Sequence, residues 1–360
     1  SFTLSGTVGG FSSATVTTIS NASGGTGLES IASIKYNAPR DYTAQDRAVT
    51  AEDYKTLVKS LYANAQAVQV YGGEDAAVPD YGKVYISIKA KSGSNLTVAT
   101  KESIVQSLKS YAVASVTPVI IDPETTFITL VVNFKYNSGA TTKDVTTLQT
   151  NVLTKVASYN NDTLEDFAGM FRYSKLTEAV NDADTSILSN ITTVKMYKYI
   201  TPTLSSALKY TLSFNNALYN PHSGHNSTAG GIVSSTGFKI NDDDSLNEHF
   251  LDDDGAGILR VYYLSGTARV YTDATYGTID YATGEVILTS ANITSISNVD
   301  GATSTQVRVF AIPSSNDIVP VRNQVLSIDT SNSSITGEVD GIVSGSSQAG
   351  TSYTTSSSYS

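Results

Sequence analysis

The chain has 360 residues, enough for two domains, because a single hydrophobic core usually stops growing near ~250 residues. Its 23 basic and 33 acidic residues give a net charge of −10, which argues against nucleic acid or an anionic membrane as a general partner. The absence of cysteine excludes disulfides and thiolate metal sites, while 22 tyrosines and a charged fraction of only 16% suit a surface that contacts other proteins.

The N-terminal part, residues 1–27, is rich in glycine, serine and threonine. The alternation over 14–19 is its only strand signal, and a glycine-rich breaker follows at 24–27. We expect a strand and a linker that follow a preceding domain, so that the chain is a fragment of a longer polypeptide. No stretch approaches ~20 consecutive apolar residues, and the sequence therefore predicts no membrane partner.

Residues 28–200 combine helical and strand patterns. Asn37, Ala38 and Pro39 are expected to end a first helix, because proline lacks the N–H that a continuing helix needs. Thr50 and Asp53 have the spacing of a capping box and predict the start of the next helix. The expected helices are 28–36, 51–62, 101–111, 142–159 and 173–181, and the expected strands are 65–71, 83–89, 116–121, 126–136 and 191–199.

The order of these elements predicts the fold class. One face of the strand at 126–136 is expected to be core, because its apolar residues alternate with others. They are Ile128, Leu130, Val132, Phe134 and Tyr136. The succession strand, strand, helix predicts an α+β domain over 28–200, with helices packed on one face of a mixed, largely antiparallel sheet.

A second domain, residues 201–343, is expected to be all-β, because the helical period disappears after Pro202. Gly284 stands at the last position of a three-residue hairpin loop, where a left-handed backbone is needed. Residues 344–360 are almost entirely serine, threonine, glycine and tyrosine, so this tail needs a partner to become ordered. The expected strands are 207–214, 258–264, 268–271, 278–281, 285–288 and 307–312.

Several short motifs follow one another along the central part of the chain. They are Ala38-Pro-Arg40, Arg47-Ala-Val-Thr-Ala-Glu-Asp-Tyr54, Lys91-Ser-Gly93, Leu96-Thr97, Val116-Thr-Pro118, Tyr173-Ser-Lys-Leu176 and Asp182-Ala-Asp184. In order and spacing they resemble the C-terminal half of the baseplate wedge proteins of contractile-tailed phages, in the T-even type and in the wider baseplate J-like group. The resemblance covers the central part well and the last third less clearly.

The resemblance implies a structural subunit in the tail baseplate of a virion, assembled in the cytoplasm of the bacterial host. It implies two copies in each wedge, a closed ring of copies around the tail hub, and contacts with other baseplate wedge proteins. It also implies that the ring rearranges when the sheath contracts. The N-terminal half of the family, which mediates many of its contacts, has no counterpart in this sequence.

For self-association the sequence favours the apolar face of the helix at 51–62 and the strand edges of the β-rich domain. Tyrosine supplies amphipathic contact area at low side-chain entropy, and a closed ring hides patches that would otherwise polymerise without limit. The helix residues predicted to carry self-association are Tyr54, Leu57, Val58, Leu61 and Tyr62.

A histidine pair is one candidate for metal ligands. His222 and His225 form an H-x-x-H motif, and His249 lies downstream. The segment around the motif is rich in glycine and asparagine, and no cysteine completes a zinc site. The pattern therefore favours a solvated loop.

Two acidic clusters, Asp242-Asp-Asp244 and Asp252-Asp-Asp254, are candidates for calcium. An EF-hand alignment fails, because Ala256 and Tyr263 would occupy ligand positions. A looser surface calcium site stays open as an alternative. The sequence predicts no bound metal and no cofactor.

The carboxylates Glu165, Asp166, Asp182 and Asp184 are the candidates for a cell-wall hydrolase. Asp182 and Asp184 stand where a helix is expected to end, which is typical of turn chemistry. The chain has no G-x-S-x-G elbow, phosphate loop or dinucleotide fingerprint. The sequence predicts that the protein is not an enzyme and has no catalytic residues.

A receptor- or glycan-binding tail protein stays open as the alternative function, because the last third is β-rich and rich in serine and threonine. Such proteins usually expose aromatic platforms. Tyr262 and Tyr263 are adjacent on an expected strand, so only one of the two can face outward.

Overall fold

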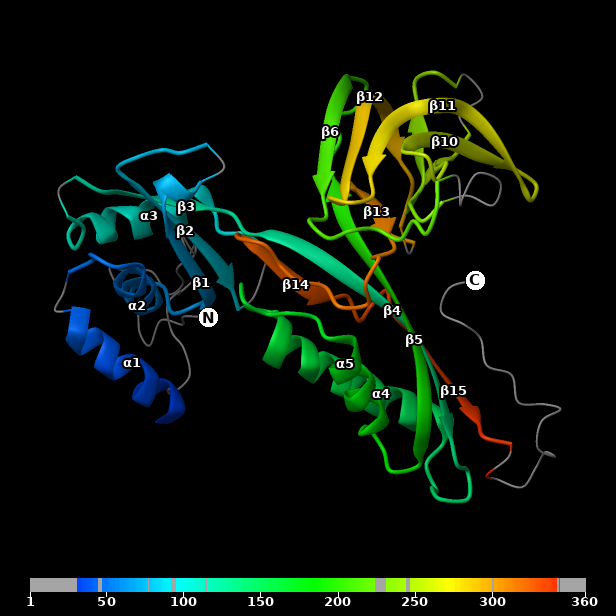
Figure 1. Cartoon of the computed structure of the whole chain (residues 1–360), viewed down its shortest axis with the longest axis horizontal. Coiled ribbons are helices and arrows are strands. Elements are labelled where there is room, and N and C mark those ends of the chain that lie inside the picture. The colour runs from blue at the N-terminus through cyan, green and yellow to red at the C-terminus, as the bar shows by residue number, and fades with distance from the viewer. Residues whose placement is uncertain are drawn as a thin grey trace, which may run out of the picture. The chain divides into compact units, whose positions relative to one another are not determined.

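The structure is a computed structural model that describes residues 31–44, 47–76, 78–91, 95–113, 115–223, 231–243, 247–299, 301–341 and 343. Internal contacts divide the chain into two units, Ser1–Ile121 and Asp122–Ser360 (Figure 1). The expected strand and linker of 1–27 and the expected tail of 344–360 lie outside the described residues. The domain boundary expected between 200 and 201 falls inside the second unit and stays a prediction.

The first unit contains a three-stranded sheet and helices, of which α2 and α3 share a hydrophobic core with the sheet. The strand order is β1–β2–β3; β1 and β2 are antiparallel, and β3 runs parallel to β2 because α3 carries the chain across between them. Its elements are α1 (Ile31–Ala44), α2 (Ala51–Leu61), β1 (Ala65–Gly72), the 3-10 helix η1 (Gly73–Asp75), β2 (Lys83–Ala90), α3 (Val98–Lys109) and β3 (Thr117–Ile121).

The capping box at the start of α2 is confirmed. Thr50 Oγ1 accepts a 3.3 Å hydrogen bond from Asp53 N, and Asp53 Oδ2 accepts a 2.8 Å bond from Thr50 N. The helix then buries one face against the sheet. The core of this unit is formed chiefly by Tyr54, Val58, Val68, Val70, Ile86, Ile88, Ile104 and Leu108.

The expected end of the first helix at Pro39 is wrong. α1 runs from Ile31 to Ala44 with Pro39 inside it. Proline removes one N–H donor, but its fixed φ near −65° is helical, so a helix can continue past it at the cost of one bond. Beyond the proline, Thr43 Oγ1 donates a 2.7 Å hydrogen bond to the Pro39 carbonyl at helical spacing.

The second unit is built around the strand pair β4 and β5. The strand order is β14–β4–β5–β13–β7, and β15 pairs with β4 further along the same strand. β5 is antiparallel to β4 and β13, whereas β14 and β15 are parallel to β4. The elements are β4 (Glu124–Tyr136), α4 (Val145–Tyr159), the π-helix η2 (Asn160–Leu164), α5 (Tyr173–Asn181), β5 (Ile187–Ile200), β7 (Ser234–Ser235), β13 (Val307–Ala311), β14 (Gln324–Ile328) and β15 (Ser334–Val339).

The apolar face predicted for β4 is the core of this sheet. Its five alternating residues from Ile128 to Tyr136 are all buried. α4 contributes to the same core because its apolar residues recur every four positions and share one helical face. These helix residues are Leu148, Val152 and Val156.

The β-rich part of the second unit contains a barrel of five strands. Pairings run in the order β11–β10–β9–β8–β12, and β11 also pairs with β12, which closes the ring. β6 pairs with β12 outside this ring, and Figure 1 shows it at the margin of the barrel beside β12. The elements are β6 (Ala207–Ser213), β8 (Phe238–Ile240), β9 (His249–Asp253), β10 (Ile258–Ser265), β11 (Ala268–Asp280) and β12 (Glu285–Ile296). An α+β chain with a β-rich part is therefore confirmed.

The hairpin glycine predicted between β11 and β12 has the expected conformation. Gly284 has φ of 74°, and its amide donates a 2.9 Å hydrogen bond to Asp280 O. The loop is one residue longer than the three expected, because the register pairs Asp280 with Glu285 and leaves four residues, 281–284, between them.

Two features of the β-rich part differ from the expectation. The segments 268–271 and 278–281 belong to one continuous strand, β11, because register shifts near Val261 let it bend without leaving β10. The strands β8, β9, β14 and β15 were not expected from the sequence. Each is only three to six residues long; β8, β14 and β15 pair mainly with strands that are distant along the chain, whereas β9 pairs mainly with the next strand, β10.

Candidate functional site

The structure divides the predicted self-association residues of α2 into two groups. Tyr54 and Val58 are 2% and 0% exposed and pack into the core of their own unit. Leu57 and Tyr62 are half-buried against that core, and Leu61 is 37% exposed. Self-association through α2 stays a prediction, and it depends on Leu61 and on the outer parts of Leu57 and Tyr62.

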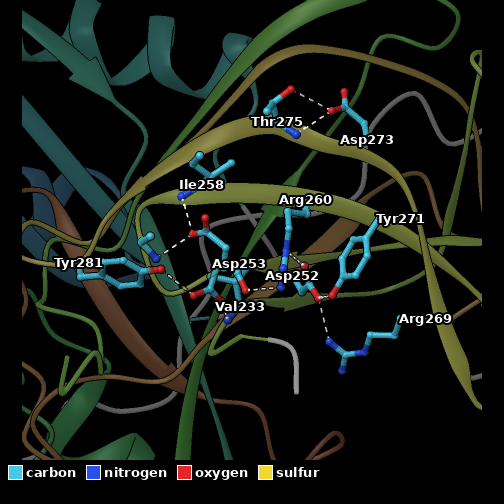
Figure 2. A network of polar contacts seen from close by, with 12 residues as sticks. Val233, Asp252, Asp253, Ile258, Arg260, Arg269, Tyr271, Asp273, Thr275 and Tyr281 are labelled. Carbon is cyan, nitrogen blue, oxygen red and sulfur yellow. Dashed lines mark hydrogen bonds and ion pairs between the residues drawn. The ribbon is translucent and has the colours of Figure 1, made fainter. Parts of the chain in front are cut away.

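A polar network around a buried carboxylate joins β9, β10 and β11 in the barrel (Figure 2). Asp252 on β9 is 1% exposed, and its Oδ1 accepts a 2.9 Å hydrogen bond from Arg260 Nε. Its Oδ2 accepts 2.8 Å bonds from Arg269 Nη1 and Tyr271 Oη. The carboxylate lies here because the register of β9 and β10 sets Asp252 opposite Arg260. Breaking the Asp252–Arg260 pair would be strongly destabilising, because it would leave a buried charge unpaired.

The two arginines of this network also cover tyrosine rings. The Arg260 guanidinium lies 4.4 Å from the centroid of Tyr271, and that of Arg269 lies 4.6 Å from the centroid of Tyr262. Tyr262 is 9% exposed. Tyr263 lies on the other face of β10, where its ring centroid is 5.8 Å from that of His249. The expected alternation of the two tyrosines is confirmed. In the network, the rings of Tyr262 and Tyr271 each have an arginine of the barrel over one face.

The neighbouring carboxylates, Asp253 and Asp254, have different partners. Asp253 is fully buried and accepts a 2.9 Å bond from Val233 N and a 2.7 Å bond from Tyr281 Oη. Burial, together with this hydrogen bond to a carboxylate, raises the pKa of Tyr281 above its usual range. Asp254 Oδ1 accepts bonds from the amides of two residues in the following turn, Ala256 and Ile258, at 2.8 Å and 2.9 Å.

In the 252–254 cluster, the carboxylates considered as calcium ligands already have hydrogen-bond donors as partners. Each carboxylate of the 252–254 cluster accepts hydrogen bonds from arginine, tyrosine or backbone donors. In the other cluster Asp244 lies outside the described residues. Among the residues that the structure describes, no group of three or more His, Cys, Asp or Glu could hold a metal ion.

The histidines do not form a described cluster. His225 lies outside the described residues, and His249 is fully buried on β9. Both ring nitrogens of His249 are hydrogen-bonded: Nδ1 lies 3.0 Å from Asn247 O, and Nε2 lies 3.0 Å from Thr272 Oγ1. Burial lowers the pKa of His249, although the Asp243 carboxylate opposes this. His249 is thus a hydrogen-bonded core residue of the barrel.

Two of the four carboxylates weighed for hydrolysis, Asp184 and Glu165, make turn or local contacts. Asp184 Oδ1 accepts bonds from Ser186 N at 3.0 Å and Ser186 Oγ at 2.7 Å, while Oδ2 pairs with Lys143 Nζ at 2.5 Å. The Lys143 contact first, and then the serine bonds, lower the pKa of Asp184 to about 2. Glu165 Oε1 accepts a 3.0 Å bond from Asn160 Nδ2. The turn chemistry expected at Asp184 is confirmed.

The hollow beside this ion pair has a volume of about 410 Å³. Its lining contains no aromatic ring that could stack on a sugar. The lining residues are Gly139, Ala140, Thr141, Thr142, Lys143, Asp184 and Thr185.

Sequence reasoning missed a second network, around Asp329. Tyr197 Oη on β5 donates a 2.5 Å hydrogen bond to Asp329 Oδ2, and Phe127 stacks on Tyr197 with 5.0 Å between ring centroids. Burial first, and then the Asp329 bond, raise the pKa of Tyr197. Asp329 Oδ1 also accepts the amides of Ser331 and Asn332. The turn signal in 329–332 could have been recognised, whereas a tyrosine 132 residues away could not.

Comparison with known proteins matches the central part of the chain. Residues 50–121 match the family described as "Baseplate structural protein gp6, C-terminal domain I", and residues 124–199 match "Baseplate structural protein gp6, C-terminal domain III". The "Baseplate wedge protein gp6" of Enterobacteria phage T4 is 31% identical over 223 residues, which cover 56% of this chain and 33% of that protein. The predicted resemblance to the C-terminal portion of baseplate wedge proteins is confirmed.

This chain spans about a third of the length of the T4 wedge protein that it matches. The matches support the prediction of a structural protein in the tail baseplate of a phage virion. A chain of the anti-feeding prophage (AFP) baseplate, solved by cryo-EM, has a TM-score of 0.34 at 15% identity, covering 46% of this chain and 37% of that chain. None of the described helices is long and apolar enough to cross a membrane.

Proposed function

We propose that this chain is a structural, non-enzymatic subunit of a contractile-tail baseplate wedge. The observation that carries the proposal is that two consecutive stretches, 50–121 and 124–199, match C-terminal domains of a baseplate structural protein. The 31% identity to the T4 wedge protein, over 56% of this chain, also supports it.

In this proposal the subunit contacts copies of itself and other wedge proteins, and the copies form a ring around the tail hub that rearranges on sheath contraction. Supporting features are the abundant tyrosine, the low charged fraction of 16% and the exposed Leu61 of α2. The carboxylates of Asp252 and Asp253 hold the barrel strands together internally. Such use of charge fits a subunit that keeps its shape while its neighbours move.

A receptor- or glycan-binding role remains the second candidate, because one observation favours it. Phe127, Tyr199 and Phe310 are half-buried and surround Tyr197, with ring centroids 5.0 to 5.4 Å from it. Partly exposed aromatic clusters of this kind can stack on sugars or on protein side chains.

Immunogold labelling of purified phage tails distinguishes the two candidates. For a wedge subunit, antibody against this chain should label the baseplate, and the chain should copurify with other wedge proteins in a constant ratio. Labelling confined to fibre tips, together with binding to host polysaccharide, would favour the second candidate. Release of reducing ends from cell-wall polysaccharide by the purified chain would contradict the non-enzymatic part of the proposal.

A further inference from the structure

β6 presents an open strand edge. Among the described strands β6 pairs only with β12. Ala207, Leu208, Lys209 and Thr211 are exposed, and Leu208 keeps 42% of its surface in solvent. A strand edge of this kind offers unpaired N–H and C=O groups to another strand.

Two hydrogen bonds establish which residues of β6 face that open edge. Phe214 N donates a 2.9 Å bond to Gly284 O, so Phe214 faces the chain that pairs with β6. Ser213 O accepts a 3.3 Å bond from Asn215 Nδ2, which places Ser213 on the outer edge. Successive residues of an antiparallel strand alternate between its two edges. Thr211 and Lys209 therefore direct their backbone N–H and C=O outward, as Ser213 does.

Two other strands of this unit have edge groups that side chains bind. The outer edge of β14 is bonded at Ile328, whose N donates a 2.6 Å bond to Asn160 Oδ1. On β5 the Thr192 carbonyl accepts a 3.0 Å bond from Tyr173 Oη. In the described part of the chain no side chain is bonded in this way to the backbone of Lys209 or Thr211. Among the residues that the structure describes, β6 therefore has an edge to which a further strand can pair.

We propose that β6 pairs antiparallel with β6 of a second copy of this chain, about a two-fold axis at Tyr210. The segment Leu208-Lys-Tyr-Thr-Leu212 is symmetric in its apolar residues around Tyr210. A two-fold pairing centred there sets Leu208 opposite Leu212 of the partner subunit on one face. The exposed Leu208 thereby gains an apolar cross-strand neighbour.

The same register suits the charges and the backbone. Lys209 lies opposite Thr211 of the partner subunit, and the two outward-facing residues exchange both backbone hydrogen bonds. A register that set Lys209 against its own copy would bring like charges directly opposite and is disfavoured. An isologous contact needs one surface that complements itself, and β6 has this property. The second copy is therefore the occupant that the sequence of β6 favours.

This inference rests on the proposed function and deepens it, because it names a surface for self-association. One strand pair buries little area, so the contact is expected to be weak between free chains. Within an assembly that holds copies together, a raised effective concentration would strengthen it.

Engineered cysteines test the register directly, because the full chain has none of its own. A mixture of Lys209→Cys and Thr211→Cys chains under mild oxidation should give several-fold more disulfide-linked dimer than either variant alone, because opposite residues have Cα atoms ~5.5 Å apart. Thr154→Cys, at an exposed position of α4, is the matched control for background cross-linking. Equal yields from the mixture and the separate variants, or yields at the Thr154→Cys level, would overturn the inference.

Thr211→Pro tests the backbone contribution in solution. The substitution removes an outward-facing backbone N–H and leaves the hydrogen bonds to β12 in place. Edge strands tolerate proline at positions whose N–H faces solvent, as it does at residue 211. We expect the dimer dissociation constant to rise about tenfold, with an unchanged melting temperature. Thr211→Ala keeps the N–H and should dimerise like the original chain.

The outcomes separate this inference from the proposed function. A Thr211→Pro chain that dimerises like the original chain, or an original chain that stays monomeric at every concentration, rejects pairing through β6. Immunogold label at the baseplate would then still leave the proposed function standing. A β6-dependent dimer without any label at the baseplate would reject the proposed function.

Discussion

Tyr281 Oη donates a 2.7 Å hydrogen bond to Oδ2 of the fully buried Asp253. The bond connects the loop between β11 and β12 to the end of β9, although β9 pairs with neither strand. A side-chain contact thus fastens a hairpin that the backbone ladder leaves separate from β9. Asp253 also lies so close to the backbone of Gly231 that a Cβ there would overlap its carboxylate.

Tyr281→Phe should destabilise the barrel. The substitution keeps the ring and removes one donor from a buried carboxylate, which costs about 1–3 kcal/mol of unfolding free energy. Chemical denaturation of the whole chain measures the change. Tyr263→Phe is the control, because the Tyr263 hydroxyl makes no hydrogen bond to any residue that the structure describes; this variant should stay within about 0.5 kcal/mol of the original chain.

Asp252→Asn should cost more, about 3–5 kcal/mol, because it removes the charge of a buried carboxylate that pairs with the largely buried Arg260 and with the more exposed Arg269. Denaturant unfolding followed by tyrosine fluorescence would report the loss. Asp254→Asn provides the comparison, since an amide oxygen can still accept the bonds from Ala256 and Ile258. If Asp252→Asn lowers the free energy of unfolding no more than Asp254→Asn does, the arginine network contributes little to stability.

Replacements on α2 should separate folding from association. Val58→Asp places an unpaired charge at a fully buried position and is expected to unfold the first unit. Leu61→Asp, at a position 37% exposed, should change stability by less than about 1 kcal/mol. If α2 takes part in self-association, combining Leu57→Asp with Leu61→Asp should raise the dimer dissociation constant. A folded, fully assembling double variant would remove α2 from consideration.

Acid should weaken the contact between Lys143 and Asp184. The pKa of Asp184 falls from 3.8 to about 2 in the folded chain, so the folded state favours the ionised carboxylate. Its contribution is therefore present above about pH 4 and is lost as the pH falls towards about 2. Asp184→Asn should lower stability at neutral pH and make the decline between about pH 4 and pH 2 shallower. Thermal unfolding measured across this pH range checks the prediction. The control is Asp162→Asn, at an exposed position of η2, whose stability should vary with pH as that of the original chain does.

Local signals in the sequence were sufficient for many elements and for the resemblance to baseplate wedge proteins. Thr50 and Asp53 form the expected capping box, and the apolar alternation from Ile128 to Tyr136 marks the buried face of β4. Gly284 has the left-handed backbone that its loop needs. Each of these features depends on residues a few positions apart, so the chemistry of a short segment is enough to determine it.

The tertiary structure alone decided the features that depend on distant partners. α1 continues through Pro39, and β11 joins two segments that read separately as strands. Asp252 has the sequence environment of a cation ligand, yet arginines brought alongside by β10 and β11 occupy its oxygens. β6 reads as an ordinary strand, and only the sheet order shows that its outer edge is open. Periodicity records which face of an element is apolar, whereas pairing partners and edges depend on packing across long sequence separations.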